Sequence, residues 1–372
     1  MFKLESRPEP SRLLSVLSPL IALALTVLIG LLLFIALGKD PLQALSMFFY
    51  EPLKNTRGIG EVSLKAAPLL LIALGLSVCF RSGIWNIGAE GQFILGTIGA
   101  TRVALSATPH SSSLLVLGVL LAGTVAGMFW AGITALLRDR FNASEILVSL
   151  MLVYVAEQVL SYFVHGPWKD PNGYNFPQSI TFLEQARVPR LVSGARANLG
   201  ALIALASMGA FWLFMHRTLA GYKLEVAGLA PRAARYAGFS SRSALWTTLL
   251  LSGATAGLAG ALEVAGPVGQ LTMDVPLGYG FAAIIVAFVG RLEPIGVCLS
   301  SLLMSLFYIG GELSQSRLGL PKSITGVFQG LLLFSLLACD ALSNYRVRFT
   351  GQRRAARVSH SSHSSHSSSE AP

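Results

Sequence analysis

The stretch that decides the fold is residues 80–92, which read Phe-Arg-Ser-Gly-Ile-Trp-Asn-Ile-Gly-Ala-Glu-Gly-Gln. It separates two apolar runs, residues 66–79 and 93–106, and each run is short for a complete membrane crossing. Polar backbone at membrane depth is tolerated only where protein or a water-filled cavity surrounds it. We therefore predict a broken membrane helix that lines a transport path. Its candidate path residues are Asn86, Gly88, Glu90, Gly91 and Gln92.

Composition places the rest of the chain in a membrane as well. Of its 372 residues, 53% are hydrophobic and only 12% are charged, whereas a soluble domain carries about 25% charged residues. Long apolar runs recur along the chain, and the short alternating segments of a membrane barrel are missing. These features predict an all-α polytopic membrane protein. The net charge of +10 lies mostly in arginines between apolar runs, where it orients helices and does not indicate nucleic-acid binding.

The apolar runs predict about ten transmembrane helices. The predicted spans are residues 13–37, 62–79, 93–106, 114–137, 146–164, 199–215, 245–264, 279–289, 295–309 and 324–339. Basic residues before the first span and after the last place both chain ends in the cytoplasm. The chain thus divides into a cytoplasmic N-terminus (1–12), a transmembrane domain (13–345) and a tail (346–372). The tail is basic and then rich in Ser and His, which predicts disorder.

A second polar break, residues 266–278, also precedes a short apolar run and contains Gln270 and Asp274. The order of helix, break, short helix and two further helices thus occurs from residue 62 and again from residue 245. The first copy starts outside and the second inside, as in an inverted-topology repeat whose broken helices meet at the transport site. We therefore add Gln270 and Asp274 to the candidate translocation path.

Other features inside the apolar runs leave two interpretations open. Glu157 and Glu263 are functional candidates because carboxylates in membrane helices are rare, but each could equally be a structural partner of a nearby Arg or hydroxyl. The motifs Gly123-x3-Gly127 and Gly253-x3-Gly257 predict close helix packing. The three cysteines have no paired spacing, so we predict neither a disulfide nor a metal site.

No enzymatic motif accompanies these features. The chain contains no phosphate-binding Gly-x4-Gly-Lys-Ser/Thr loop, no His-Glu-x-x-His and no Gly-x-Ser-x-Gly. We therefore expect neither a catalytic residue nor a cofactor, and we do not expect the chain to be an enzyme.

A second informative stretch lies in the cytoplasmic segment 216–243, where residues 228–239 read Gly-Leu-Ala-Pro-Arg-Ala-Ala-Arg-Tyr-Ala-Gly-Phe. A proline suits the first turn of a helix and a glycine suits its end, so a short helix is predicted between the two. Such a helix could dock in a groove of a partner; the alternative is a loop whose arginines only set topology. The candidate coupling residues are Gly228, Pro231, Arg232, Ala233, Ala234, Arg235 and Gly238.

Together the two stretches resemble the membrane subunits of ABC importers, in the class that serves branched-chain amino acids, simple sugars and nucleosides. Residues 86–92 are similar to the signature of the nucleoside-type branch, and residues 228–239 to the family's coupling-helix segment, which contacts the ATPase subunit. Ala230 replaces the usual Asn before the proline, and it is a poorer helix cap. The resemblance extends through residues 252–263 and covers about residues 13–345.

The resemblance implies a permease subunit for a small polar solute, a nucleoside or a simple sugar, with ATP hydrolysed by a separate subunit. The implied partners are ABC ATPase subunits, a second permease subunit and an extracytoplasmic solute-binding protein, assembled in a bacterial cytoplasmic (inner) membrane. Asn86, Glu90 and Gln92 would either hydrogen-bond the solute or hold the broken helix ends. The alternative function is an ion-coupled secondary transporter with inverted repeats, driven by protons through Glu157 or Glu90.

Overall fold

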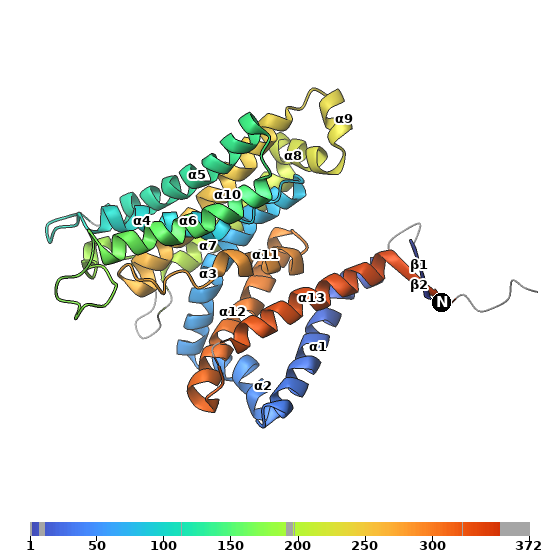
Figure 1. The fold of residues 1–372 in the computed structure, drawn as a ribbon, viewed down its shortest axis with the longest axis horizontal. Coiled ribbons are helices and arrows are strands. Elements are labelled where there is room, and N and C mark those ends of the chain that lie inside the picture. The colour runs from blue at the N-terminus through green and yellow to red at the C-terminus, as the bar shows by residue number, and fades with distance from the viewer. Residues whose placement is uncertain are drawn as a thin grey trace, which may run out of the picture.

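The computed structural model describes residues 2–6, 12–112, 114–190, 196, 198–321 and 323–349, and this part of the chain is almost entirely helical (Figure 1). The α-helices are α1 (Arg12–Ala36), α2 (Pro41–Phe49), α3 (Thr56–Arg81), α4 (Ala89–Ala104), α5 (Leu115–Phe141), α6 (Glu145–His165), α7 (Leu199–Arg217), α8 (Leu219–Leu229), α9 (Pro231–Tyr236), α10 (Ser241–Glu263), α11 (Tyr279–Val289), α12 (Pro294–Leu318) and α13 (Ile324–Asn344). Short turns of 3-10 helix, η1 (Glu51–Leu53) and η2 (Glu184–Ala186), and of π-helix, η3 (Val264–Val268), join them. Strands β1 (Phe2–Ser6) and β2 (Tyr345–Phe349) pair antiparallel, with Phe2 opposite Phe349.

The predicted all-α membrane fold is confirmed, and a helix occupies each of the ten predicted spans. Within the described residues, seven helices are long and apolar enough to cross a membrane, namely α1, α3, α5, α6, α7, α10 and α12. The helices that follow the two breaks, α4 and α11, are short as expected, and the apolar part of α13 is short too. The count of ten spans therefore stays a prediction.

The connection between the first two spans contains the short helix α2, and Pro41 occupies its first helical position. Its fixed backbone angle suits that position, and Asp40 caps the helix by accepting a hydrogen bond from the Leu42 amide at 2.9 Å. Helix α3 also starts earlier than predicted, at Thr56, because its first turns are polar and fall outside the apolar run.

The centre of the protein is formed by α3 and α10. In their apolar windows 89% and 72% of residues are buried, against 22–28% in α1, α5, α6 and α7. The two central helices run antiparallel, because Gly75 lies against Ser252 while Cys79, one turn on, donates to the Thr248 carbonyl at 3.3 Å. A helix that is apolar all round is stable only when other helices surround it, which explains the central place of α3.

The packing around this pair is reciprocal between the two predicted units, which begin at residues 62 and 245. Helix α10 packs extensively against α4 and α5, the short helix and the next helix of the first unit. Helix α3 packs in the same way against α11 and α12, the corresponding helices of the second unit. Each long helix thus supports the short helix that belongs to the other half.

Close packing of α5 on α10 depends on the two predicted glycine motifs. A Cβ on Gly127 would lie 2.3 Å from the Gly253 carbonyl oxygen, and a Cβ on Gly257 would lie 2.3 Å from that of Gly123. Only glycine lets the two backbones approach this closely. The packing prediction for both motifs is confirmed, and they pack against each other.

Figure 1 shows α8, α9 and the two strands at one end of the molecule, and the connection between α6 and α7 at the other. Both described ends of the chain and the coupling segment therefore share one side, as the charge distribution predicts. Of the tail expected to be disordered, residues 346–349 belong to β2, and residues 350–372 lie outside the described residues.

Candidate functional site

The first break is a short turn between the end of α3 and the start of α4. Gly83 has a φ of +72°, and the Ile84 amide donates to the Cys79 carbonyl at 2.9 Å, which together close α3 in a Schellman motif. The chain then crosses residues 84–88 without regular structure before α4 begins at Ala89. The break is thus built from local turn chemistry.

Asn86 and Gln92 form a closed amide pair across this turn. Asn86 Nδ2 donates to Gln92 Oε1 at 3.1 Å, and Gln92 Nε2 donates back to Asn86 Oδ1 at 3.2 Å. Asn86 also donates to Ser252 Oγ of α10 at 3.0 Å and accepts from the Gly88 amide at 3.1 Å. Both amides are buried, and the hydrogen bonds fasten the break to α4 and to α10.

Glu90 joins the two breaks. Its carboxylate is only 2% exposed and accepts hydrogen bonds from the backbone amides of Gly278, at 3.0 Å, and of Gly280. Gly278 is the N-cap of α11 and Gly280 lies in its first turn, where the helix dipole favours an anion. Glu90 itself lies in the first turn of α4, so one carboxylate sits between the N-termini of both short helices.

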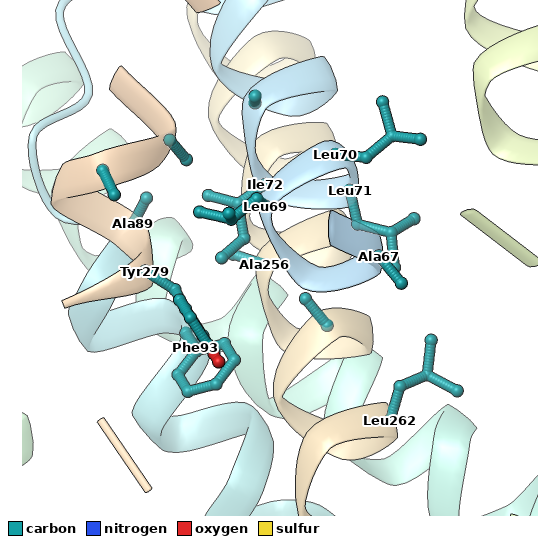
Figure 2. Packing of buried hydrophobic residues seen from close by; sticks show 14 of the residues in the cluster. Ala67, Leu69, Leu70, Leu71, Ile72, Ala89, Phe93, Ala256, Leu262 and Tyr279 are labelled. Carbon is teal, nitrogen blue, oxygen red and sulfur yellow. The ribbon is translucent and has the colours of Figure 1, made fainter. Parts of the chain in front are cut away.

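Close packing surrounds this junction. A Cβ on Gly280 would lie 2.2 Å from the Glu90 amide nitrogen, so only glycine permits the contact. Phe93 and Tyr279 meet edge to face next to it, with ring centroids 5.9 Å apart at 88°. Figure 2 shows these two rings close to Ala89. In this conformation the junction is filled by protein.

The two candidate residues of the second break, Gln270 and Asp274, lie in different surroundings. The Gln270 side chain accepts from Thr181 Oγ1 at 3.2 Å and donates to Gln178 Oε1 at 3.3 Å, so it is held by the long connection between α6 and α7. Asp274 instead lines a cavity of about 250 Å³. The structure therefore brings neither residue to the Asn86–Gln92 pair.

We call this cavity the polar chamber. The charged residues that line it are Glu61, Lys65, Arg196, Glu263, Asp274 and Glu312. Two ion pairs lie on its wall, Lys65 Nζ to Glu312 Oε1 at 3.5 Å and Arg196 to Glu61 Oε1 at 3.4 Å. Glu263 was a candidate from the sequence but Lys65 was not, although its isolated charge in an apolar run was a usable signal. Glu157 lies on α6 and is not among the residues that line the chamber.

The predicted short helix in the coupling segment is present as α9. Pro231 occupies its first turn, and Ala230 precedes it without a side-chain cap, as the residue type implies. At its end Gly238 has a φ of +80°, and the Phe239 amide donates to the Ala234 carbonyl at 2.9 Å. The capping pattern thus correctly predicted both ends of the helix.

One face of α9 is free in this chain. Ala234 is buried, whereas Arg232, Ala233 and Arg235 are exposed, and within the described residues neither arginine forms an ion pair. Tyr236, which was not among the residues predicted from the sequence, is 98% exposed. Tyrosine and arginine side chains are enriched where protein surfaces bind one another.

Gly228 connects the coupling segment to the membrane helices. A Cβ at this position would lie 1.9 Å from the Arg81 carbonyl oxygen, so the end of α8 rests directly on the end of α3. The Arg81 side chain pairs with Glu293 in the turn between α11 and α12, and Glu293 also lies 3.5 Å from His216 Nε2 at the end of α7. The ends of α3, α7, α8 and α11 are thus linked at one point.

Comparison with known proteins identifies the family of this chain. The chain belongs to the family described as branched-chain amino acid transport system / permease component, which matches residues 58–337. It is 35% identical over 347 residues to the glucose ABC transporter permease protein TsgB13 of Haloferax volcanii, covering 91% of both chains.

Two nucleoside permeases are also similar. The nucleoside ABC transporter permease protein NupB of Lactococcus lactis subsp. cremoris is 28% identical over 327 residues, which cover 86% of this chain and 90% of that one. The guanosine ABC transporter permease protein NupP of Bacillus subtilis is 27% identical over 340 residues, which cover 91% and 96%.

These similarities make the chain a permease of the nucleoside and sugar branch of ABC importers. It is a multi-pass membrane protein and the transport component of its system, and ATP is hydrolysed by a separate ATPase subunit. The ion-coupled alternative is therefore set aside.

Proposed function

We propose that this permease imports a small, neutral solute rich in hydroxyl groups, a simple sugar or a nucleoside, across a bacterial cytoplasmic membrane. It would do so together with a second permease subunit and an extracytoplasmic solute-binding protein. The similarity to permeases named for glucose, nucleosides and guanosine supports this substrate class. The lining of the polar chamber supports it independently.

Hydrogen-bond acceptors outnumber cations in the polar chamber. Lys65 and Arg196 are each paired with a carboxylate on the wall. Glu263 and Asp274 form no ion pair among the described residues, so their oxygens remain available as acceptors. Hydroxyl groups of a sugar or ribose are donors that suit such acceptors. An anionic solute would be repelled, because Glu61, Asp274 and Glu312 outnumber the two cations on the wall.

We infer that Asn86, Glu90 and Gln92 brace the path and do not bind the solute in this conformation. All three are buried and are hydrogen-bonded to protein groups. Gly88 and Gly91 brace the path too, because they let α4 pack closely against its neighbours. A Cβ on Gly88 would lie 2.8 Å from the Ser149 carbonyl oxygen, and one on Gly91 would lie 3.1 Å from a ring nitrogen of α5. The start of α4 would thus move with its neighbours as one body.

The conformational change would begin at α9. In this mechanism the exposed face with Arg232, Arg235 and Tyr236 docks on the ATPase subunit, and closure of the ATPase subunits displaces α8 and α9. The contact of Gly228 with the Arg81 carbonyl passes the displacement to α3, and the Arg81–Glu293 pair passes it to the turn after α11. Because both short helices meet at Glu90, the two breaks would shift together and exchange access.

The linkage through Gly228 and Arg81 is the observation that carries this mechanism, and the chamber's acceptors carry the substrate class. Uptake measured with the assembled transporter tests the latter. Neutral sugars or nucleosides should compete for uptake, while a nucleoside monophosphate should not. Glu263→Gln and Asp274→Asn should each lower uptake about tenfold, since a hydrogen bond to a charged group contributes roughly 1.5–3 kcal/mol. Unchanged uptake in both variants would contradict a role of the chamber.

A further inference from the structure

A larger cavity lies at the end of the molecule opposite to the coupling helices. Its volume is about 750 Å³, and it opens between the first turns of α5 and α7, beneath the segment that contains η2. Its apolar wall includes Leu117 and Leu120 of α5 and Leu199 and Ile203 of α7. We call it the lateral cavity.

Two arginines from the connection between α6 and α7 also line the lateral cavity. They are Arg187 and Arg190, and the only acid among the described residues of the lining is Glu184. Neither arginine forms an ion pair within the described part of the chain. The Nε of Arg187 is buried and has no hydrogen-bond partner there. An unpaired buried donor is costly, so an incoming acceptor would relieve that cost.

The walls of the lateral cavity are continuous with helix faces that other parts of this chain leave uncovered. Only 28% of the apolar window of α5 and 22% of that of α7 is buried, and Leu117 is 57% exposed. The cavity lies at the ends of two helices that span the membrane, which is the depth of lipid headgroups.

We propose that the lateral cavity binds an anionic phospholipid. The phosphate accepts hydrogen bonds from the guanidinium groups of Arg187 and Arg190, for which a planar fork of donors is well suited. An acyl chain lies along the leucine wall of α5. A soluble anion would satisfy the arginines but would leave this apolar wall facing water, which is why the structure favours a lipid.

The second break touches this site. Gly266, within η3, lines the lateral cavity, and a Cβ on Gly269 would lie 2.5 Å from the Arg187 guanidinium. The Val188 amide also donates to the Ala265 carbonyl at 2.9 Å. A lipid that holds Arg187 therefore holds the segment that leads to α11. Lipid composition would thereby adjust transport without contacting the solute.

Photo-crosslinking of the assembled transporter in phosphatidylcholine vesicles tests this proposal. Phosphatidylglycerol that carries a diazirine on an acyl chain should label peptides of α5 and α7 around Leu117 and Ile203, and a phosphatidylcholine probe should label them several-fold less. Each of Arg187→Gln and Arg190→Gln should lower labelling by about fivefold, the effect of one basic residue near an anionic lipid surface. Arg102→Gln is the matched control, because Arg102 is exposed in the last turn of α4 and does not line the cavity.

A second variant keeps the test decisive if the arginine variants fail to fold. Leu117→Trp narrows the space beside the apolar wall, where the acyl chain would lie, and leaves both arginines in place. It should therefore lower labelling while the transporter still elutes as an intact complex. Equal labelling by the two lipid probes, or labelling that neither the arginine variants nor Leu117→Trp reduces, would overturn the proposal. Complete protection by inorganic phosphate alone would also overturn it, since that result defines a site for a soluble anion.

Discussion

Replacing Gly228 by alanine should interrupt the path from the ATPase to the breaks. The new Cβ would lie 1.9 Å from the Arg81 carbonyl oxygen and 2.9 Å from the Ser82 carbonyl carbon. Ordinary contact begins at 3.4 Å, so α8 has to retreat from α3 by about 1.5 Å, the difference between these distances. Because the groups that collide belong to the backbone, no change of side-chain rotamer relieves the clash.

This retreat should affect coupling more than assembly. The exposed residues of α9 are unchanged, so the ATPase subunit should still co-purify. Uptake should fall about tenfold, which corresponds to the loss of about 1.4 kcal/mol of coupling between sites. The overpacking itself should cost about 1–3 kcal/mol of stability. Solute uptake, ATP hydrolysis and co-purification, measured on one reconstituted sample, separate these effects.

Gly209→Ala on α7 is the matched control. No atom lies within 4 Å of the Cβ that it would add, and alanine favours a helix over glycine, so transport should be unchanged. Parental uptake by Gly228→Ala with the ATPase subunit bound would refute the linkage. Loss of the ATPase subunit together with uptake would also refute it, because the contact would then serve assembly.

Three further substitutions test the coupling face, the junction and the central packing. Arg235→Glu should abolish co-purification with the ATPase subunit while membrane insertion persists. Arg102→Glu, at the opposite end of the molecule, is the control and should retain the complex. Co-purification of the ATPase subunit with Arg235→Glu would contradict the docking role. Glu90→Gln should lower the thermal unfolding temperature, because two backbone amides of α11 lose a charged acceptor worth roughly 1.5–3 kcal/mol; an unchanged temperature speaks against bracing. Gly127→Ala should also lower the thermal unfolding temperature, because its Cβ would collide with a carbonyl of α10. Gly132→Ala on the same helix, whose Cβ would have its nearest neighbour at 3.7 Å, should leave that temperature unchanged. Equal unfolding temperatures of the two variants would contradict the role of Gly127 in close packing.

Glu90 shows where inference from sequence stops. Its carboxylate was recognisable as unusual because it stands in an apolar chain beside a helix break, and a solute contact and a bracing role were both open. The structure places Gly278 and Gly280 against it, nearly two hundred residues further along the chain. No local pattern predicts which distant amides a carboxylate meets, because that depends on how the two halves of the fold interlock.

By itself, the sequence determined the membrane class, the positions of both breaks and the short helix α9. Hydropathy, helix caps and turn residues act over a few neighbouring positions, so their consequences can be worked out locally, as Pro231 and Gly238 show for α9. It also determined that both glycine motifs lie in close packing. Only the tertiary structure decided that they pack against each other.

The same holds for residues 80–92. Their polarity predicted a break, but the fold decided that Asn86 and Gln92 satisfy one another and that Glu90 bridges two helix ends. The open polar surface lies instead in the chamber near Asp274, where Lys65, Glu263 and Glu312 converge from three helices. Convergence of this kind depends on long-range packing, since side chains distant in sequence meet only when the helices that carry them are in contact.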